Sequence, residues 1–332
     1  MSVRQQDIAK HLGLSISTVS LALRNAAHVS EETRLRVRDA ALRLGYVYRP
    51  RPLARREISQ IAFITHLEPS NVFYTTVLSG AERECRSQHI SLHYTRLEAP
   101  FLDDHLQYSD ADALLVVGTI DEQTVLRLQA LERPMVLIDN NLPHLGIDRI
   151  LIENVGSMFR VTQQIAAYGH QQIAYMVGPD DHPSFRERRQ GYHLAMERLG
   201  LQPIELPCPS TEQGAAEQAI VEWLASHRDI GFSALLTFHD EAAIEVIHTL
   251  HDHGVAVPDQ VAVVGFDDID MARMVRPALT TCHVHRELLG AWGVRRLLQR
   301  AAYPDEPPIA ITIDTSFVER GSARPRNVQS QK

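Results

Sequence analysis

Polar residues that directly follow apolar runs are the first candidates for chemistry in this chain of 332 residues. Carboxylate, amide and imidazole groups can hydrogen-bond a small ligand rich in hydroxyl groups, and aromatic rings can stack on its apolar faces. One such residue alone is more simply explained as a cap of a turn or helix, but several together favour a binding site. The candidates are Thr65-His66, Gly118-Thr119, Asp139-Asn140, Gly178-Pro179, His239-Asp240 and Asp267-Asp268, with Phe73, Tyr74 and Phe185 as possible aromatic faces.

A second kind of chemistry is indicated near the N-terminus. Val19 and Leu23 lie four residues apart and mark the buried face of a short helix, so its other face points outward. Short uncharged side chains on such a face can approach base edges in the major groove of DNA. The outward residues are Ile16, Ser17, Ser20 and Leu21, and the candidate phosphate contacts around them are Arg4, Lys10, Arg24, Arg34 and Arg36. The alternative is a generic three-helix bundle with an arginine-rich solvated face.

Catalytic and metal sites are less well supported. Asp139 and Asp267 could act as paired carboxylates, which glycosidases place on either side of a bond. However, the expected turns contain no GxGxxG, P-loop, HExxH or GxSxG motif. His248, His251 and His253, with Asp252, resemble metal ligands in composition, but a surface face beside a helix C-terminus explains them better. We therefore expect no catalytic residue, no metal ion and no cofactor.

The elements that must position the strand-end residues alternate between strand and helix from Ile58 onward. Apolar runs of strand length occur at 61–65, 113–118, 135–139, 173–178, 234–238 and 261–266, and amphipathic stretches lie around 75–87, 121–131, 156–168, 186–199, 212–226, 241–253 and 287–300. This alternation predicts an α/β fold with buried parallel strands, whose carboxyl ends are the usual place for a ligand. About 270 residues exceed one typical sheet domain, so we expect two lobes.

The first sixty residues instead predict three short helices. Ser15 and Ser30 are suitable N-caps for the second and third helices, and Gly45 is a suitable residue after the end of the third. Two helices joined by a tight turn containing Gly13, with a third helix to close the core, form a helix-turn-helix.

The net charge of −8 conceals an uneven distribution. Residues 1–57 contain eleven Lys/Arg and five Asp/Glu, a balance of +6, whereas the remainder contains 22 and 36, a balance of −14. A basic N-terminal module on an acidic body indicates that the module binds a polyanion.

Ordered motifs in the N-terminal region resemble the DNA-binding signature of the lac-repressor/galactose-repressor family. The resemblance implies an N-terminal all-α helix-turn-helix head and hinge (1–57), followed by a two-lobed periplasmic-binding-protein-like body with parallel sheets (58–332). It also implies that Ile16, Ser17 and Leu21 read bases, with Ser15 at the helix start and Thr18 and Ser20 nearer the DNA backbone. The motifs are Asp7-Ile8-Ala9, Gly13-Leu14-Ser15, Ser17-Thr18-Val19-Ser20, Val29-Ser30-Glu31-Glu32-Thr33-Arg34 and Leu44-Gly45-Tyr46.

The body resembles the family's effector-binding part. Arg188, three residues before Gly191, matches the effector-binding arginine, and Asp139, His239 and Asp267 match other effector positions. Two residues depart from the family pattern. His239 stands where a small polar residue is commoner, and Glu153 stands where an aspartate precedes Asn154.

The segment 47–58 also departs from the family pattern. The resemblance places a hinge helix there, with a leucine that wedges into the minor groove, and Leu53-Ala54-Arg55 matches its sequence. Two prolines, Pro50 and Pro52, precede this motif and resist helix formation. A hinge helix with Leu53 and Arg55 on DNA and an extended basic linker are equally compatible with the sequence.

The composition is that of an ordinary globular protein, with 44% hydrophobic and 22% charged residues. Without a signal peptide or membrane-length apolar run, and with only three separated cysteines, we expect a cytoplasmic protein without disulfides. We expect a homodimeric repressor that binds a palindromic, double-stranded operator and responds to a sugar or sugar phosphate. The alternative functions are a two-lobed sugar-binding protein or a carbohydrate-active enzyme, neither with a DNA function.

Overall fold

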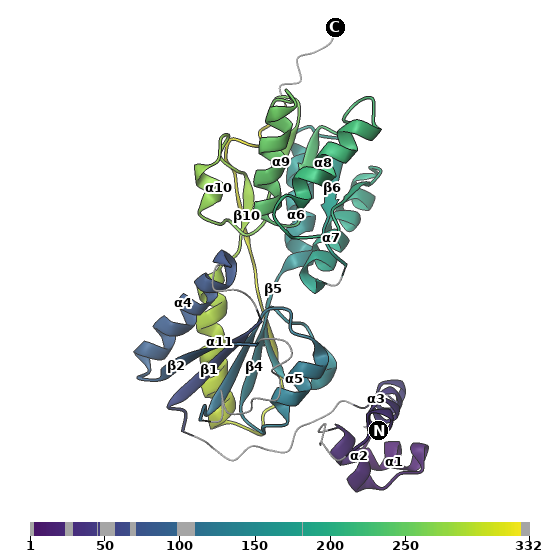
Figure 1. Ribbon diagram of the computed structural model, residues 1–332, viewed down its shortest axis with the longest axis vertical. Coiled ribbons are helices and arrows are strands. Elements are labelled where there is room, and N and C mark those ends of the chain that lie inside the picture. Colours follow the sequence, from purple (N-terminus) through teal and green to yellow (C-terminus); the bar gives the residue numbers. More distant parts are fainter. Residues whose placement is uncertain are drawn as a thin grey trace. The chain divides into compact units, whose positions relative to one another are not determined.

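The computed structural model describes residues 3–23, 29–44, 46, 57–66, 71–97, 110–180 and 182–326 (Figure 1). The chain divides into two compact units, which we call unit 1 (residues 1–151 and 286–311) and unit 2 (residues 152–285 and 312–332). The chain therefore passes between the units three times. Among the described residues, no helix is both long and apolar enough to cross a membrane.

The three predicted N-terminal helices are present and share a small core of their own. Gly13 takes the left-handed conformation (φ 67°) between the first two, as a tight helix-turn-helix requires. Leu35 of the third helix is 58% exposed and lies outside this core. The helices are α1 (Gln5–Leu12), α2 (Ile16–Leu23) and α3 (Glu31–Leu44), and their core consists of Ile8, Ala9, Val19, Ala22, Leu23, Val29, Val37, Ala40 and Ala41.

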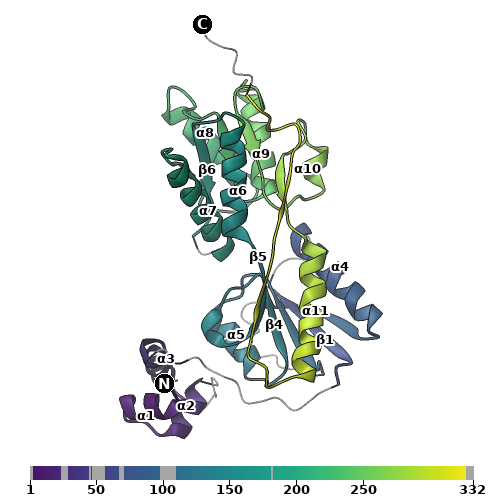
Figure 2. The ribbon, with the colours of Figure 1, turned by 180° about the vertical axis from the view of Figure 1, so that it is seen from behind.

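Unit 1 contains a six-stranded sheet of order β11-β5-β4-β3-β1-β2. Its central strands are buried on both faces. Helix α5 covers one face, while α4 and α11 pack together on the other (Figures 1 and 2). The elements are β1 (Gln60–Thr65), α4 (Val72–Ser87), β2 (Ser91–Arg96), β3 (Ala113–Val117), α5 (Glu122–Gln129), β4 (Met135–Ile138), the 3₁₀ turn η2 (Pro143–Leu145), β5 (Asp148–Ile152), α11 (Arg286–Ala302) and β11 (Ala310–Ile313).

The close crossing of α4 and α11 in unit 1 explains why Gly80 and Gly290 are glycines. A Cβ on Gly290 of α11 would lie 2.0 Å from the carbonyl oxygen of Val77 in α4. A Cβ on Gly80 of α4 would lie 2.0 Å from the carbonyl oxygen of Glu287. Real Cβ atoms do not approach backbone so closely, so the two helices can cross at this distance only through glycine.

Unit 2 contains a four-stranded parallel sheet of order β7-β6-β8-β9 and a two-stranded antiparallel pair, β10-β12. Helices α6 and α7 pack together, as do α8 and α9. The elements are α6 (Asn154–Ala167), β6 (Ile173–Val177), α7 (Pro183–Leu199), β7 (Ile204–Pro207), α8 (Ala215–Ser226), β8 (Ala234–Leu236), α9 (Asp240–Asp252), β9 (Ala262–Val264), α10 (Met271–Met274), β10 (Thr281–His283) and β12 (Ser316–Val318).

Candidate functional site

The start of α2 presents hydroxyl groups and one apolar side chain to solvent. Ser15 caps the helix, since its Oγ accepts a hydrogen bond from the Thr18 backbone N–H at 3.0 Å. The Ser15 Oγ also lies 2.7 Å from the hydroxyl oxygens of both Ser17 and Thr18. Ile16 is 46% exposed, and the first turn contains no acidic residue. The positive end of this helix is therefore open to an anionic partner.

The outward orientation predicted for the four α2 residues is found clearly for only two of them. Ile16 and Ser17 are exposed, but Ser20 is half-buried and Leu21 packs partly against the core of the head. Leu21 contributes to the core because so small a domain has few apolar residues with which to build one.

The candidate phosphate contacts differ in exposure and in the hydrogen bonds that their side chains already make. Arg4, Lys10 and Arg36 are exposed. Arg34 is half-buried, and its Nε and Nη2 donate to the Val29 carbonyl oxygen at 2.9 and 2.7 Å. Arg34 thus fastens the start of α3 to the preceding loop, a bond that the sequence pattern does not reveal. Arg24, Leu53, Arg55 and the whole question of the hinge lie outside the described residues.

In unit 1, Asp139 follows β4 and lies at the carboxyl end of this strand. Its Oδ2 accepts a hydrogen bond of 2.7 Å from the Tyr74 hydroxyl, and the residue is 8% exposed. Phe73 contacts the Tyr74 ring edge-on with ring centres 4.8 Å apart. At the end of β1, which β3 separates from β4, burial lowers the pKa of His66 despite the opposing charge of Asp121. The predicted set of Phe73, Tyr74 and Asp139 thus belongs to one cluster.

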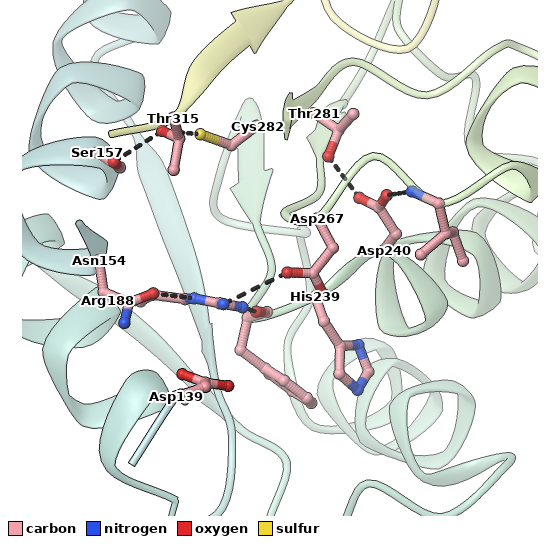
Figure 3. Close-up of polar contacts among 12 residues, drawn as sticks. Asp139, Asn154, Ser157, Arg188, His239, Asp240, Asp267, Thr281, Cys282 and Thr315 are labelled. Atoms are coloured by element: carbon pink, nitrogen blue, oxygen red, sulfur yellow. Dashed lines mark hydrogen bonds and ion pairs between the residues drawn. The ribbon is translucent and has the colours of Figure 1, made fainter. Parts of the chain in front are cut away.

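In unit 2, Arg188 is the centre of a buried polar network (Figure 3). Its side chain is 3% exposed, and its Nε donates to Asn154 Oδ1 at 2.9 Å. Its Nη1 donates to the Phe238 carbonyl oxygen, and its Nη2 lies 3.4 Å from Asp267 Oδ1. The guanidinium also lies over the Phe266 ring, 3.8 Å from its centre. These contacts fix the orientation of Arg188, as a recognition residue requires.

Asp267 and Asp268 form a strained turn directly after β9. Their φ angles are 116° and 57°, in the left-handed half of backbone space that non-glycine residues avoid, at a cost of roughly 1–3 kcal/mol each. Both residues are buried. Strain of this kind persists only where neighbouring contacts hold it, and it is common at ligand sites.

His239 lies beside this network with 14% of its side chain exposed, and it acts as the N-cap of α9. Its Nδ1 accepts a hydrogen bond from the Ala242 backbone N–H at 3.0 Å, which requires an unprotonated nitrogen. Burial lowers the pKa of His239 to about 3, and the positive charge of Arg188 acts in the same direction. The imidazole is therefore neutral and replaces the small polar side chain that commonly caps such a helix.

Aromatic rings form a wall next to His239. The Phe185 ring stacks on His182 with ring centres 4.0 Å apart and lies 4.8 Å from Phe238. A Cβ on Gly178 would lie 2.9 Å from atoms of both phenylalanine rings, so this position after β6 requires glycine. The Phe185 ring also contacts His239 edge-on, with ring centres 5.8 Å apart, so the two residues belong to one cluster.

Other candidates have structural roles. Arg189 forms an ion pair of 2.6 Å with Glu205, and Arg186 donates to the Asp180 carbonyl oxygen, so of the three arginines only Arg188 enters the network. Glu153 caps α6 by accepting from the Gly156 N–H at 2.7 Å. Asp240 is fully buried between Thr281 and the Ile269 N–H, and its pKa is raised well above the usual value, chiefly by burial.

Two partners of Arg188 are absent from the sequence-based set. Asn154 follows β5, a strand that the apolar pattern did not reveal, so its strand-end position was not recognised. Phe266 ends the apolar run 261–266, which indicates only a buried position. Nothing in the sequence shows that the guanidinium of Arg188 lies over its ring. Among the described residues, no group of three or more His, Cys, Asp or Glu residues is arranged to hold a metal ion.

Comparison with family models gives a match to each part of the chain. Residues 5–48 match the model "Bacterial regulatory proteins, lacI family", and residues 162–323 match "Periplasmic binding protein-like domain".

Full-length relatives and solved structures are similar throughout. The ribose operon repressor of Escherichia coli K12 is 29% identical over 96% of this chain and 99% of its own length. The transcriptional repressor PurR of Aliivibrio fischeri ES114 is 27% identical over 97% and 98%. The CelR–cellobiose complex (TM-score 0.73, 23% identity, 97% of this chain and 100% of that chain) and the operator-bound lac repressor dimer (0.71, 24%, 97% and 99%) share the fold.

Proposed function

Because the chain belongs to the lacI family of bacterial regulatory proteins, and is thus a DNA-binding transcriptional regulator rather than an enzyme, we propose that it represses a carbohydrate-related operon in response to a small effector. We assign operator binding to residues 1–57 and effector binding and dimerisation to residues 58–332. One observation carries the DNA assignment. The exposed start of α2, without acidic residues, lies on a segment with a charge of +6, whereas the rest of the chain has −14. Affinity for a polyanion must therefore come from the head.

The charges of the residues at the carboxyl ends of the strands in the two units favour an uncharged sugar as effector over a sugar phosphate. In unit 2 the charges of Arg188 and Asp267 cancel, and His239 is neutral. In unit 1, Asp139 adds a negative charge and His66 is held neutral by burial. A phosphate dianion would find no uncompensated cation among these residues, whereas sugar hydroxyls can hydrogen-bond to all of them. Solved structures of similar fold with bound cellobiose or ribose support this class of ligand.

The mechanism that we propose is a population shift. An effector that contacts these residues in both units favours one arrangement of the units, and this arrangement alters operator affinity. Replacement of Arg188 by Ala should then abolish the effector response while leaving operator affinity within about twofold, since the head is unchanged. A normal response of this variant would refute the role of Arg188.

We propose a homodimer that binds a palindromic operator. The support in the chain is an apolar surface on unit 1 at the edge strand β2 and helix α4. Tyr94 is 41% exposed there, and Val72 is 42% exposed. Between the two elements lies a groove of about 350 Å³ whose apolar lining includes Leu78, Ile90 and Leu92. A symmetric contact would cover both the groove and the open strand edge.

The DNA assignment is tested by the salt dependence of duplex binding. Each phosphate contact contributes about −0.9 to the slope of log K against log salt. Replacement of the exposed Arg36 of the head by Ala should reduce the magnitude of this slope by about one. Replacement of Arg198, which is exposed at the end of α7, should leave it unchanged. Equal effects of the two substitutions would refute the assignment.

The effector assignment is tested by thermal-shift measurements with matched pairs of ligands. Ribose is compared with ribose 5-phosphate, cellobiose with its phosphate, and glucose with glucose 6-phosphate. We expect stabilisation by an uncharged member of a pair and a weaker effect of its phosphate. Stabilisation by phosphates alone would overturn the charge argument.

A further inference from the structure

The strained Asp267–Asp268 turn is held on the side away from Arg188 by a cluster around the Asp268 carboxylate. Asp268 Oδ1 accepts from Arg320 Nη2 at 2.5 Å, and Asp268 Oδ2 lies 2.9 Å from His283 Nδ1. Arg273 of α10 lies 3.5 Å from the same Oδ2. The Asp268 side chain is 3% exposed, so these contacts are shielded from water on most sides.

The two carboxylates of the turn therefore have different partners. Asp267 is directed toward Arg188, as Figure 3 shows, while Asp268 is bound by residues from α10, β10 and the segment after β12. Backbone bonds link the same parts, since the Asp267 N–H donates to the Cys282 carbonyl oxygen at 2.8 Å. Because the two residues are adjacent in one positive-φ turn, the contacts that hold the Asp268 side chain also restrain the backbone that carries Asp267.

His283 is the residue of strand β10 whose side chain contacts the Asp268 carboxylate. It lies beside the turn, since Asp267 and His283 form an isolated parallel bridge. Burial alone would oppose ionisation of Asp268, but the hydrogen bonds and positive charges of Arg320 and His283 outweigh it and lower the pKa of this carboxyl. Asp268 is thus an ionised hydrogen-bond acceptor. His283 donates to it from Nδ1–H, both when the ring is neutral in this tautomer and when it is doubly protonated.

We propose that His283 is a positioning residue for the effector site, which holds the strained Asp267–Asp268 turn closed and so keeps the Asp267 carboxylate against Arg188. The role of Asp267 toward an effector rests on the proposed function, whereas the restraint of the turn by His283 does not. The function of His283 is to donate a hydrogen bond, so the proposal depends on the donor and not on the bulk of the ring.

The proposal is tested by hydrogen–deuterium exchange of the full-length, effector-free protein, followed in peptides that cover residues 264–285. His283→Leu removes the donor, and we expect the amides of this segment to exchange about tenfold faster through local opening, which corresponds to the loss of one hydrogen bond to a charged group. His283→Asn places an amide N–H near the position of Nδ1 and should restore slow exchange. His251→Leu, at a site that is 88% exposed in the same unit, is the matched control and should exchange like the wild type.

Exchange of the segment in His283→Leu at the wild-type rate would overturn the proposal. Equal acceleration in His283→Asn and His283→Leu would also overturn it, because the ring and not the donor would then matter. Faster exchange throughout unit 2 would show a general loss of stability and would likewise contradict a local role. None of these outcomes depends on effector binding, so failure of the proposed function would be recognised separately in the ligand and operator assays.

Discussion

The neutral state of His239 leads to a quantitative prediction about pH. Its pKa is lowered from 6.5 to about 3 by burial, with Arg188 as a further cause, whereas in the unfolded chain the ring titrates normally. As pH falls below 6.5, the unfolded state takes up a proton that the folded state refuses, so folding is disfavoured. Between pH 7.5 and pH 5.0 this single group should cost about 2 kcal/mol, at about 1.4 kcal/mol for each unit of pH below 6.5.

The substitution His239→Asn isolates this contribution. An asparagine Oδ1 can accept the hydrogen bond from the Ala242 N–H that His239 Nδ1 accepts now, so the cap of α9 is kept while the titration is removed. We expect the variant to be close to the wild type in stability at pH 7.5 and more stable than it by about 2 kcal/mol at pH 5.0.

The assay is urea unfolding of both proteins at the two pH values, followed by circular dichroism. Taking the difference between variant and wild type cancels the contributions of the other titrating groups. His251→Asn is the control, since that side chain is 88% exposed and should leave the pH dependence unchanged. If His239→Asn lost as much stability on acidification as the wild type, His239 would not be a neutral cap, and the charge argument for the effector would fail with it.

Three further predictions concern the elements that carry the sites. Gly290→Ala should destabilise the protein by about 1–3 kcal/mol in urea unfolding, because its Cβ would lie 2.0 Å from the Val77 carbonyl oxygen; a neutral effect would contradict the close crossing of α4 and α11. Glu245→Ala should cost about 1 kcal/mol, since this carboxylate accepts from the Gly214 and Ala216 N–H groups at the start of α8; unchanged thermal stability would show that the cap contributes nothing. Ser15→Ala should cost about 1 kcal/mol of head stability and weaken operator binding in fluorescence anisotropy, and full operator affinity would argue against the start of α2 as the contact.

The parts of the fold that the sequence predicts are those with a strong periodic signal. The buried parallel strands of both units are continuous apolar runs, because their two faces are both covered. Most of the strands that the pattern does not reveal are at edges or in short pairs, but β5 is an interior strand whose residues alternate between buried and half-buried. Only one of the six residues of strand β2 is buried, and β7 and β12 are only partly buried, so these strands lack a continuous apolar run.

For the proposed effector site, the sequence predicts candidate residues but not their contacts. Strand-end position and family resemblance together select Asp139, Arg188, His239 and Asp267 as candidates. The partners that orient Arg188 were not predictable, because a backbone carbonyl and the face of Phe266 leave no mark in a sequence. For His239, the sequence indicates a strand-end position and a departure from the family pattern, whereas its role as a neutral cap follows from a desolvated environment that only the fold supplies.

The measurement that tests the central claim most directly is selection of duplexes from a random pool by the full-length protein, followed by sequencing of the bound fraction. A homodimeric regulator with two α2 helices in successive major grooves predicts enrichment of an inverted repeat whose half-sites are about one or more helical turns apart. Replacement of Ile16 should change the base preference within each half-site while retaining the symmetry. Recovery of sequences without twofold symmetry, or no enrichment at low salt, would contradict the account.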